Sequence, residues 1–331
     1  MSFTEIEKKQ LKIFVAVAFG LPVVMGVLMG ISYYQGNDVS AFPNAHMFYP
    51  AAGVMLALLL TGDKEKPMPR KFYYTFLAAT AVMIVCAIAS VFAPQLGWMM
   101  LCQIPVIIFS VVCLVFLLIE KKEVCTAYGI RFAGKKGAKS GLYMLLFFVL
   151  YILRTFIALA IEGQTGAFVE IITSPDTYMM IVTLAVTFFL AFTAFFGEEY
   201  GWRFFFQPFL QKRFGKKGGV LLLGVFWGLW HLPINIFYYS PDTWFISVIL
   251  QIITCVSFSI FFGYGYMKTE NIWVPVVMHY INNNMIAVIG GADAIGGQVY
   301  RWKDIPLTLV LDVMFIVFIF SKVYREPKEN S

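Results

Sequence analysis

Charged side chains are scarce in this chain. Of its 331 residues only 13% are Asp, Glu, Lys or Arg, whereas soluble domains carry about 25%. Hydrophobic types make up 60%, with 34 Phe and 17 Tyr among them, and the mean hydropathy is +0.77. A water-soluble fold needs more polar surface than this. The scarcity of charge excludes a soluble enzyme, a disordered chain and a nucleic-acid-binding domain, and it leaves a polytopic membrane protein.

Cysteine and histidine are scarce as well. Five cysteines are dispersed along the chain without a Cys-x-x-Cys pair, so they form neither a disulfide framework nor a thiolate metal site and are expected to be packing residues. Strands of alternating polarity are also missing, which excludes a membrane β-barrel. What remains is a set of continuously apolar segments, typical of membrane-crossing helices.

The apolar segments predict an all-α polytopic membrane protein. A helix needs about 20 apolar residues to cross the hydrocarbon core. The chain offers about ten such spans, at 11–34, 45–62, 72–93, 98–119, 140–161, 177–197, 218–237, 243–267, 272–290 and 305–322.

Basic residues indicate the orientation of these spans. In a ten-span arrangement the Lys/Arg-rich segments fall on one side, and the loops around Asp38 and Asp242 on the other side hold almost no basic residues. By the positive-inside rule both termini are cytoplasmic. The basic residues are Lys8, Lys9, Lys64, Lys66, Arg70, Lys71, Lys121, Lys122, Arg131, Lys135, Lys136, Lys139, Lys212, Arg213, Lys216, Lys217, Lys322, Arg325 and Lys328.

Two opposite charges lie inside predicted spans. Arg154 is in the middle of the fifth span and Asp312 is part of the way along the tenth. A charge near the bilayer centre costs at least about 2.5–3.5 kcal/mol, so such residues are functional candidates. The two side chains are expected to form a buried ion pair, and a substrate-binding charge is the alternative.

A second polar cluster is spread over three spans. The sixth span ends in Glu198-Glu199-Tyr200-Gly201-Trp202-Arg203, the seventh contains Trp227-Gly228-Leu229-Trp230-His231, and the ninth contains His279-Tyr280-Ile281-Asn282-Asn283. Residues i and i+4 share a helix face, whereas i and i+1 diverge by about 100°. The spacing therefore predicts a Glu199–Arg203 salt bridge, a Glu198 side chain that points elsewhere, and His279 and Asn283 side by side. The third histidine, His46, is expected at a membrane edge without a chemical role.

This set of side chains is sufficient for hydrolysis of a peptide bond. A carboxylate beside an imidazole can take a proton from water and make the water a nucleophile. A second imidazole and an amide can donate to the oxyanion of a tetrahedral intermediate. The spacing alone leaves other roles open.

The three motifs resemble those of the CPBP family of intramembrane glutamic proteases, which includes CAAX endopeptidases and the Abi and bacteriocin-immunity proteins. The family signature is Glu-Glu-x-x-x-Arg, Phe-x-x-x-His and His-x-x-x-Asn on separate helices. The first and third motifs are complete here, between 198 and 203 and between 279 and 283. The second departs from the signature, because Trp227 stands where the family has Phe.

The resemblance implies an eight-helix protease core over residues 71–331, with its motifs between 198 and 283, preceded by two extra helices in residues 1–70. It implies that Glu198 with His231 activates water, that His279 with Asn283 forms the oxyanion hole, and that no metal or other cofactor is needed. Glu199, Arg203 and Trp227 are the implied supporting residues.

The substrate implied by the resemblance is a peptide or membrane protein within or beside the lipid bilayer, and a prenylated CAAX protein if the chain is of CAAX type. The aromatic-rich, Ile- and Lys-containing composition favours a bacterial plasma membrane. Under this orientation Glu198 is expected at the cytoplasmic end of its helix, whereas His231 lies deeper in the next span. Either the seventh helix begins later than 218 or residues 198–217 dip into the membrane, and 203–217 could continue the helix out of the bilayer.

Two alternatives remain open from the residues. The first is a zinc-dependent membrane metalloprotease, because two histidines and a glutamate match a zinc site with an open position for water. Its usual His-Glu-x-x-His spacing is missing. The second is a non-catalytic scaffold, an immunity protein or a transporter in which buried charges form an ion path.

Overall fold

The computed structural model describes residues 3–63, 65–134, 136–291 and 294–326, and in these ranges the regular structure is helical throughout. The first half of the chain forms α1 (Glu5–Val15), α2 (Leu21–Tyr34), α3 (Ala41–His46), α4 (Tyr49–Thr61), α5 (Arg70–Phe92), α6 (Trp98–Leu101), α7 (Gln103–Ile119) and α8 (Lys122–Ala127). The second half forms α9 (Gly137–Ile161), α10 (Thr165–Thr173), α11 (Pro175–Glu199), α12 (Gln207–Trp230), α13 (Leu232–Ile234), α14 (Trp244–Thr269), α15 (Trp273–Gly290) and α16 (Asp304–Ile316).

Local sequence explains several helix ends. Thr4 caps α1 in a capping box with Glu7, which satisfies two backbone donors that have no partner within the helix. Pro175 occupies the first turn of α11, where its missing N–H costs nothing. At the end of α15 Gly291 takes a positive φ of 84°, a conformation that glycine adopts without a steric penalty.

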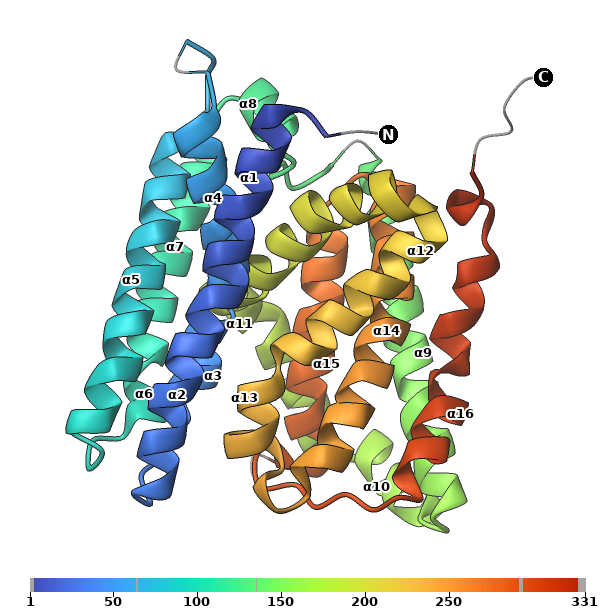
Figure 1. Cartoon of the computed structure of the whole chain (residues 1–331). Coiled ribbons are helices and arrows are strands. Elements are labelled where there is room, and N and C mark those ends of the chain that lie inside the picture. The colour runs from blue at the N-terminus through green and yellow to red at the C-terminus, as the bar shows by residue number, and fades with distance from the viewer. Residues whose placement is uncertain (1–2, 64, 135, 292–293, 327–331) are drawn as a thin grey trace.

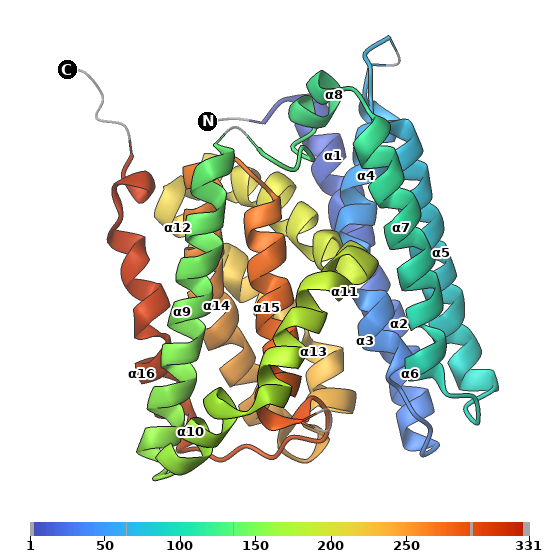
Figure 2. The ribbon, with the colours of Figure 1, turned by 180° about the vertical axis from the view of Figure 1, so that it is seen from behind.

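The helices form two groups with α11 between them (Figures 1 and 2). Helices α1 to α8 lie on one side, α9 and α12 to α16 lie on the other, and α11 packs against α4, α7 and α15. Aromatic rings fill the contact between the groups: Phe14 of α1 lies 6.1 Å from Trp202 and 4.9 Å from Phe205, measured between ring centroids. Residues 1–70 are therefore packed directly on the segment that follows Glu198.

The fold class predicted from the sequence is confirmed, and each predicted span coincides with a helical segment. Seven helical runs in the described residues are long and apolar enough to cross a membrane. One of them, 175–230, covers both the sixth and the seventh predicted spans. Helices α15 and α16 are not among the seven, so the count of ten spans stays a prediction.

The expected helix end at Glu198 is wrong. Helix α11 continues through a π-helical segment, Tyr200–Phe206, directly into α12. The chain reverses at Gly215, whose φ of 75° breaks α12 into two arms. Glu198 is thus in the interior of a bent helical run and is only 2% exposed. Within the seventh predicted span α12 ends at Trp230, and α13 and a π-helical segment, Asn235–Tyr239, continue beyond it.

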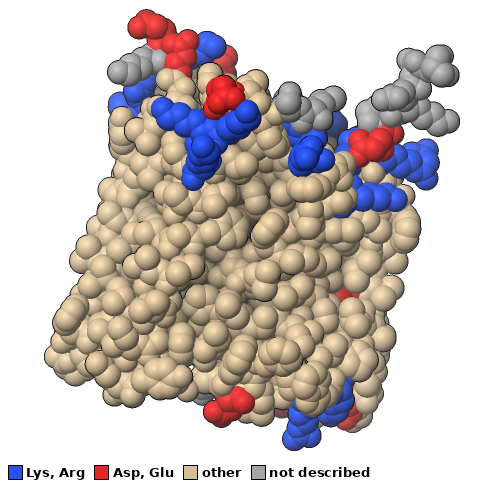
Figure 3. All heavy atoms as spheres, viewed as in Figure 1, with Lys and Arg blue, Asp and Glu red and all other residues tan. Residues whose placement is uncertain are grey.

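In Figure 3 most charged side chains lie at the two ends of the molecule, and a broad band of uncharged residues with one small acidic patch separates them. Most Lys and Arg side chains in this view lie at the end where α1 begins and where the chain leaves α16 (Figures 1 and 3). Of the basic residues used for orientation, Lys64, Lys135 and Lys328 lie outside the described residues. The band agrees with an integral membrane protein.

The cysteines are all free. Four are buried in the hydrophobic core, and Cys86 is half-buried. Burial raises the pKa of the Cys125 thiol, on α8 outside the long apolar helices, and this keeps it a neutral packing group.

Candidate active site

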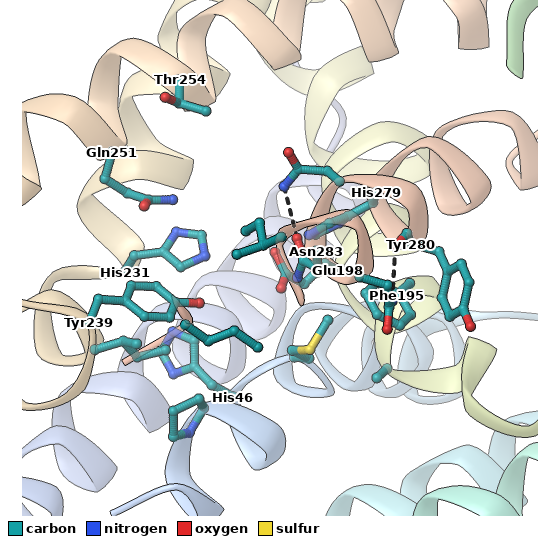
Figure 4. A pocket seen from close by; sticks show the side chains of 18 of the residues that line it. His46, Phe195, Glu198, His231, Tyr239, Gln251, Thr254, His279, Tyr280 and Asn283 are labelled. Atoms are coloured by element: carbon teal, nitrogen blue, oxygen red, sulfur yellow. Dashed lines mark hydrogen bonds between the residues drawn. The ribbon is translucent and has the colours of Figure 1, made fainter. Parts of the chain in front are cut away.

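The four predicted catalytic side chains line one cavity of about 620 Å³ (Figure 4). Glu198 comes from α11, His231 from the junction of α12 and α13, and His279 and Asn283 from α15. The cavity is lined by α11, by α9 and α12 to α15 of the second group, and by α3, α6 and α7 of the first group. The size is within the range of small-molecule and peptide pockets.

Glu198 has one oxygen held and one free. Its Oε2 accepts a hydrogen bond of 2.7 Å from Nε1 of Trp227 and a longer one of 3.4 Å from Nε1 of Trp202. Among the described residues Oε1 has no hydrogen-bond partner. One carboxylate oxygen is therefore available to a water molecule or substrate in the cavity.

Glu199 points away from the cavity, as the helical spacing predicts. Its Oε2 lies 3.2 Å from Nε of Arg203 and its Oε1 lies 2.9 Å from Nδ1 of His279. Both Glu199 and Arg203 are fully buried. The guanidinium also lies over the ring of Trp227, 4.7 Å from its centroid, a cation–π contact that partly replaces lost hydration.

The hydrogen bonds of the two histidines define their tautomers. Nδ1 of His231 lies 2.8 Å from the carbonyl oxygen of Trp227, an atom that only accepts, so Nδ1 carries the proton and Nε2 keeps its lone pair. Nδ1 of His279 likewise donates to the Glu199 carboxylate. A partner on one ring nitrogen sets the role of the other. His231 thus presents a proton acceptor on its remaining nitrogen.

Asn283 is oriented by its neighbour. Nδ2 of Asn282 donates to Oδ1 of Asn283 over 2.9 Å. This contact leaves the amide N–H groups of Asn283 available as donors (Figure 4). An amide held in this way suits stabilisation of negative charge on a substrate oxygen.

His46 occupies a different place from the one expected. It is 4% exposed rather than at a membrane edge, and it lines the same cavity. Its Nε2 lies 3.1 Å from the carbonyl oxygen of Trp230, and its ring centroid is 6.3 Å from that of His231. Pro43, Asn44 and Met47 line the cavity with it, so residues 1–70 supply part of the cavity wall.

The two intramembrane charges are paired. Nε of Arg154 donates to Oδ1 of Asp312 over 2.8 Å. Asp312 is fully buried, whereas Arg154 is 25% exposed and lines the cavity.

Sequence reasoning missed Trp202 and Asn282 as well as His46. Trp202 is four residues after Glu198, so the same i,i+4 rule that paired Glu199 with Arg203 places it beside Glu198. Asn282 is adjacent to Asn283, and His46 is far from every motif in the sequence. Only the first of these three carried a usable signal.

Comparison with known proteins agrees with the motifs. A family model described as type II CAAX prenyl endopeptidase Rce1-like matches residues 180–285, the segment that contains all three motifs. No curated protein and no solved structure matches the chain. The resemblance identified from the sequence is thus confirmed. The protein is an integral membrane protein whose segment 180–285 is similar to the Rce1-like type II CAAX prenyl endopeptidases, a family of peptide-bond hydrolases.

Proposed function

We propose that the protein is a metal-independent intramembrane endopeptidase of the glutamic type, with Glu198 as the general base. The observation that carries this proposal is the free Oε1 of Glu198 in the same cavity as the unprotonated Nε2 of His231. A water molecule between these two acceptors donates one hydrogen bond to each, and its oxygen lone pair is directed at a substrate carbonyl.

One proton passes from water to Glu198 and then to the leaving amine, and this balances the reaction. Glu198 takes a proton from water as the oxygen attacks the carbonyl carbon, and a tetrahedral intermediate forms. The proton then passes from the Glu198 carboxyl to the leaving amine nitrogen as the C–N bond breaks. The carboxylate is regenerated, and no covalent enzyme intermediate is required.

His279 and Asn283 are proposed to bind the oxyanion. The Nδ1–H group of His279 donates to the Glu199 carboxylate, and a second proton on Nε2 is proposed to supply the donor to the oxyanion. The Asn283 amide adds a second donor from the same helix face. Donors of this kind contribute about 2.7–4 kcal/mol each in hydrolases.

The ligand arrangement favours this mechanism over a zinc site. Among the described residues no three His, Cys, Asp or Glu side chains are grouped closely enough to hold a metal ion. Oε2 of Glu198 already accepts from two indole N–H groups, and Asn283 has no role in a His₂Glu site.

The substrate is proposed to be a peptide segment that enters from the bilayer, either unmodified or prenylated as in the family name. The basic end of the molecule is proposed to face the cytoplasm of a bacterial cell, with both chain termini on that side.

Peptide cleavage by the detergent-purified protein tests the mechanism. A broad peptide library with several prenylated members is incubated with the unmodified protein, with Glu198→Gln and with Glu162→Gln, a matched change at an exposed position outside the cavity. Parallel reactions contain a zinc chelator. We expect cleavage by the unmodified protein and Glu162→Gln, with or without chelator, and none by Glu198→Gln.

Two outcomes contradict the proposal. Cleavage that the chelator abolishes, and that added zinc restores, supports the metalloprotease alternative. Cleavage by the Glu198→Gln variant would show that Glu198 is not the general base.

A further inference from the structure

The cavity contains one feature that the hydrolytic mechanism does not use. Arg154 is the only Lys or Arg among the described residues that line it, and Glu198 is the only Asp or Glu. Placing a guanidinium in a cavity walled mainly by apolar and aromatic side chains has a free-energy cost that a structural role alone does not explain. The charged group therefore indicates that the cavity binds a ligand at Arg154.

The ion pair with Asp312 leaves most of the guanidinium unused. Asp312 is bound end-on through Nε alone, although Arg and carboxylate groups often pair through two parallel hydrogen bonds. Oδ2 of Asp312 is buried and has no hydrogen-bond partner among the described residues. In the same ranges neither terminal nitrogen of Arg154 has one. The edge of the guanidinium that carries two parallel N–H groups is thus free.

Asp312 instead acts on the orientation of Arg154. The carboxylate is fully buried on α16, and by holding Nε it restricts rotation of the planar guanidinium on α9. A side chain fixed by a buried neighbour binds with a smaller loss of conformational entropy. The pair therefore resembles a positioned binding group more than a simple structural contact.

We propose that Arg154 is a carboxylate-binding subsite of the cavity, which anchors the substrate through its free guanidinium edge while Glu198 attacks a peptide bond elsewhere in the same cavity. A carboxylate matches two parallel N–H donors, whereas a neutral amide accepts through one oxygen only. On a peptide the carboxylate is either the C-terminal group or an Asp or Glu side chain. This subsite rests on the proposed function, because it takes a peptide as the ligand.

Binding is measured on the catalytically inactive Glu198→Gln protein, so that the result does not depend on turnover. The probes are three short fluorescent peptides of one apolar sequence: a free C-terminal acid, the C-terminal carboxamide, and the carboxamide with one internal Glu. We expect at least one carboxylate-bearing peptide to bind about tenfold more tightly than the plain carboxamide. The peptide that shows the gain identifies the source of the carboxylate.

Two further variants in the same background assign the effect to Arg154. Asp312→Asn keeps the guanidinium and should retain the preference for carboxylate. Arg154→Gln combined with Asp312→Asn removes both charges, leaves no unpaired buried carboxylate, and should abolish the preference. A purely structural ion pair predicts that the two variants behave alike.

The proposal is overturned if the three peptides bind Glu198→Gln equally or not at all, a comparison that requires no change at the ion pair. It is also overturned if the double variant keeps the preference. If the unmodified protein cleaves peptides but shows no preference for a carboxylate, only the proposed subsite is contradicted. If carboxylate-bearing peptides bind more tightly but none is cleaved, only the hydrolytic mechanism is contradicted.

Discussion

The indole N–H of Trp227 donates a 2.7 Å hydrogen bond to Oε2 of Glu198. The backbone carbonyl of the same residue accepts a hydrogen bond from Nδ1–H of His231. Trp227 therefore holds both members of the proposed water-activating pair, and it does so at the position where the family signature has Phe. A phenylalanine would keep the backbone contact and the ring but lose the donor.

Trp227→Phe should lower peptide cleavage by about tenfold to a hundredfold, because a hydrogen bond to a charged group is worth about 1.5–3 kcal/mol. The measurement is kcat/KM on one peptide. Trp302→Phe, at an exposed indole outside the cavity, is the control and should leave kcat/KM unchanged. Unchanged cleavage by Trp227→Phe would show that the indole donor does not support Glu198.

The Glu199–Arg203 pair is predicted to be structural. Both side chains are fully buried, and Arg203→Leu leaves the Glu199 carboxylate without its main counter-ion. Removal of one partner of a buried pair costs about 3–5 kcal/mol. Thermal unfolding in detergent should show a large drop for Arg203→Leu and a smaller one for Glu199→Gln/Arg203→Met.

Activity separates this structural role from catalysis. The double variant should regain stability but not cleavage, because His279 has lost the carboxylate that holds its Nδ1 proton. A double variant that is both stable and fully active would show that Glu199 does not act through His279.

Asn282 is predicted to act through Asn283. Asn282→Ala removes the donor that orients the Asn283 amide, so kcat should fall by about tenfold with a smaller change in KM, as for an interaction made mainly in the transition state. Asn283→Ala should cost about a hundredfold or more, the size of a lost oxyanion donor. Steady-state kinetics of both variants on one peptide measures the two losses. An Asn282→Ala variant with unchanged kcat would contradict the orienting role.

Much of the site was predictable because helical spacing is a local property. The i,i+4 rule separates Glu198 from Glu199 and pairs Glu199 with Arg203, and the structure has both features. The same rule also places Trp202 beside Glu198. The position of His46 could not be predicted in this way, because helical spacing does not show which distant segments of the chain pack together.

The fold was predictable from apolar runs wherever polar residues face water. The prediction was wrong at Glu198, where charges inside the protein resemble a helix end. Glu199 and Arg203 pair with each other inside the protein rather than face the solvent, so the helix passes through them and breaks at Gly215. Hydropathy cannot distinguish a charge that leaves the bilayer from one that is paired within it.

Close packing of residues 1–70 on the motif helix gives the last prediction. A Cβ added at Gly201 would lie 2.2 Å from Cβ of Pro50, which is held rigidly in the first turn of α4. Small residues allow such close helix contacts in membranes, and overpacking costs about 1–3 kcal/mol. Gly201→Ala should therefore lower the unfolding temperature in detergent. It should also lower cleavage, because the displaced helix carries Glu198.

Gly141→Ala is the matched control for this prediction. Gly141 lies in α9, and an added Cβ there meets no atom within 4 Å. Alanine is the better helix former by up to about 1 kcal/mol, so this variant should be at least as stable as the unmodified protein and equally active. If Gly201→Ala behaved like Gly141→Ala, α4 would not be packed closely on the motif segment, and the place of His46 and Met47 in the cavity wall would not depend on that contact.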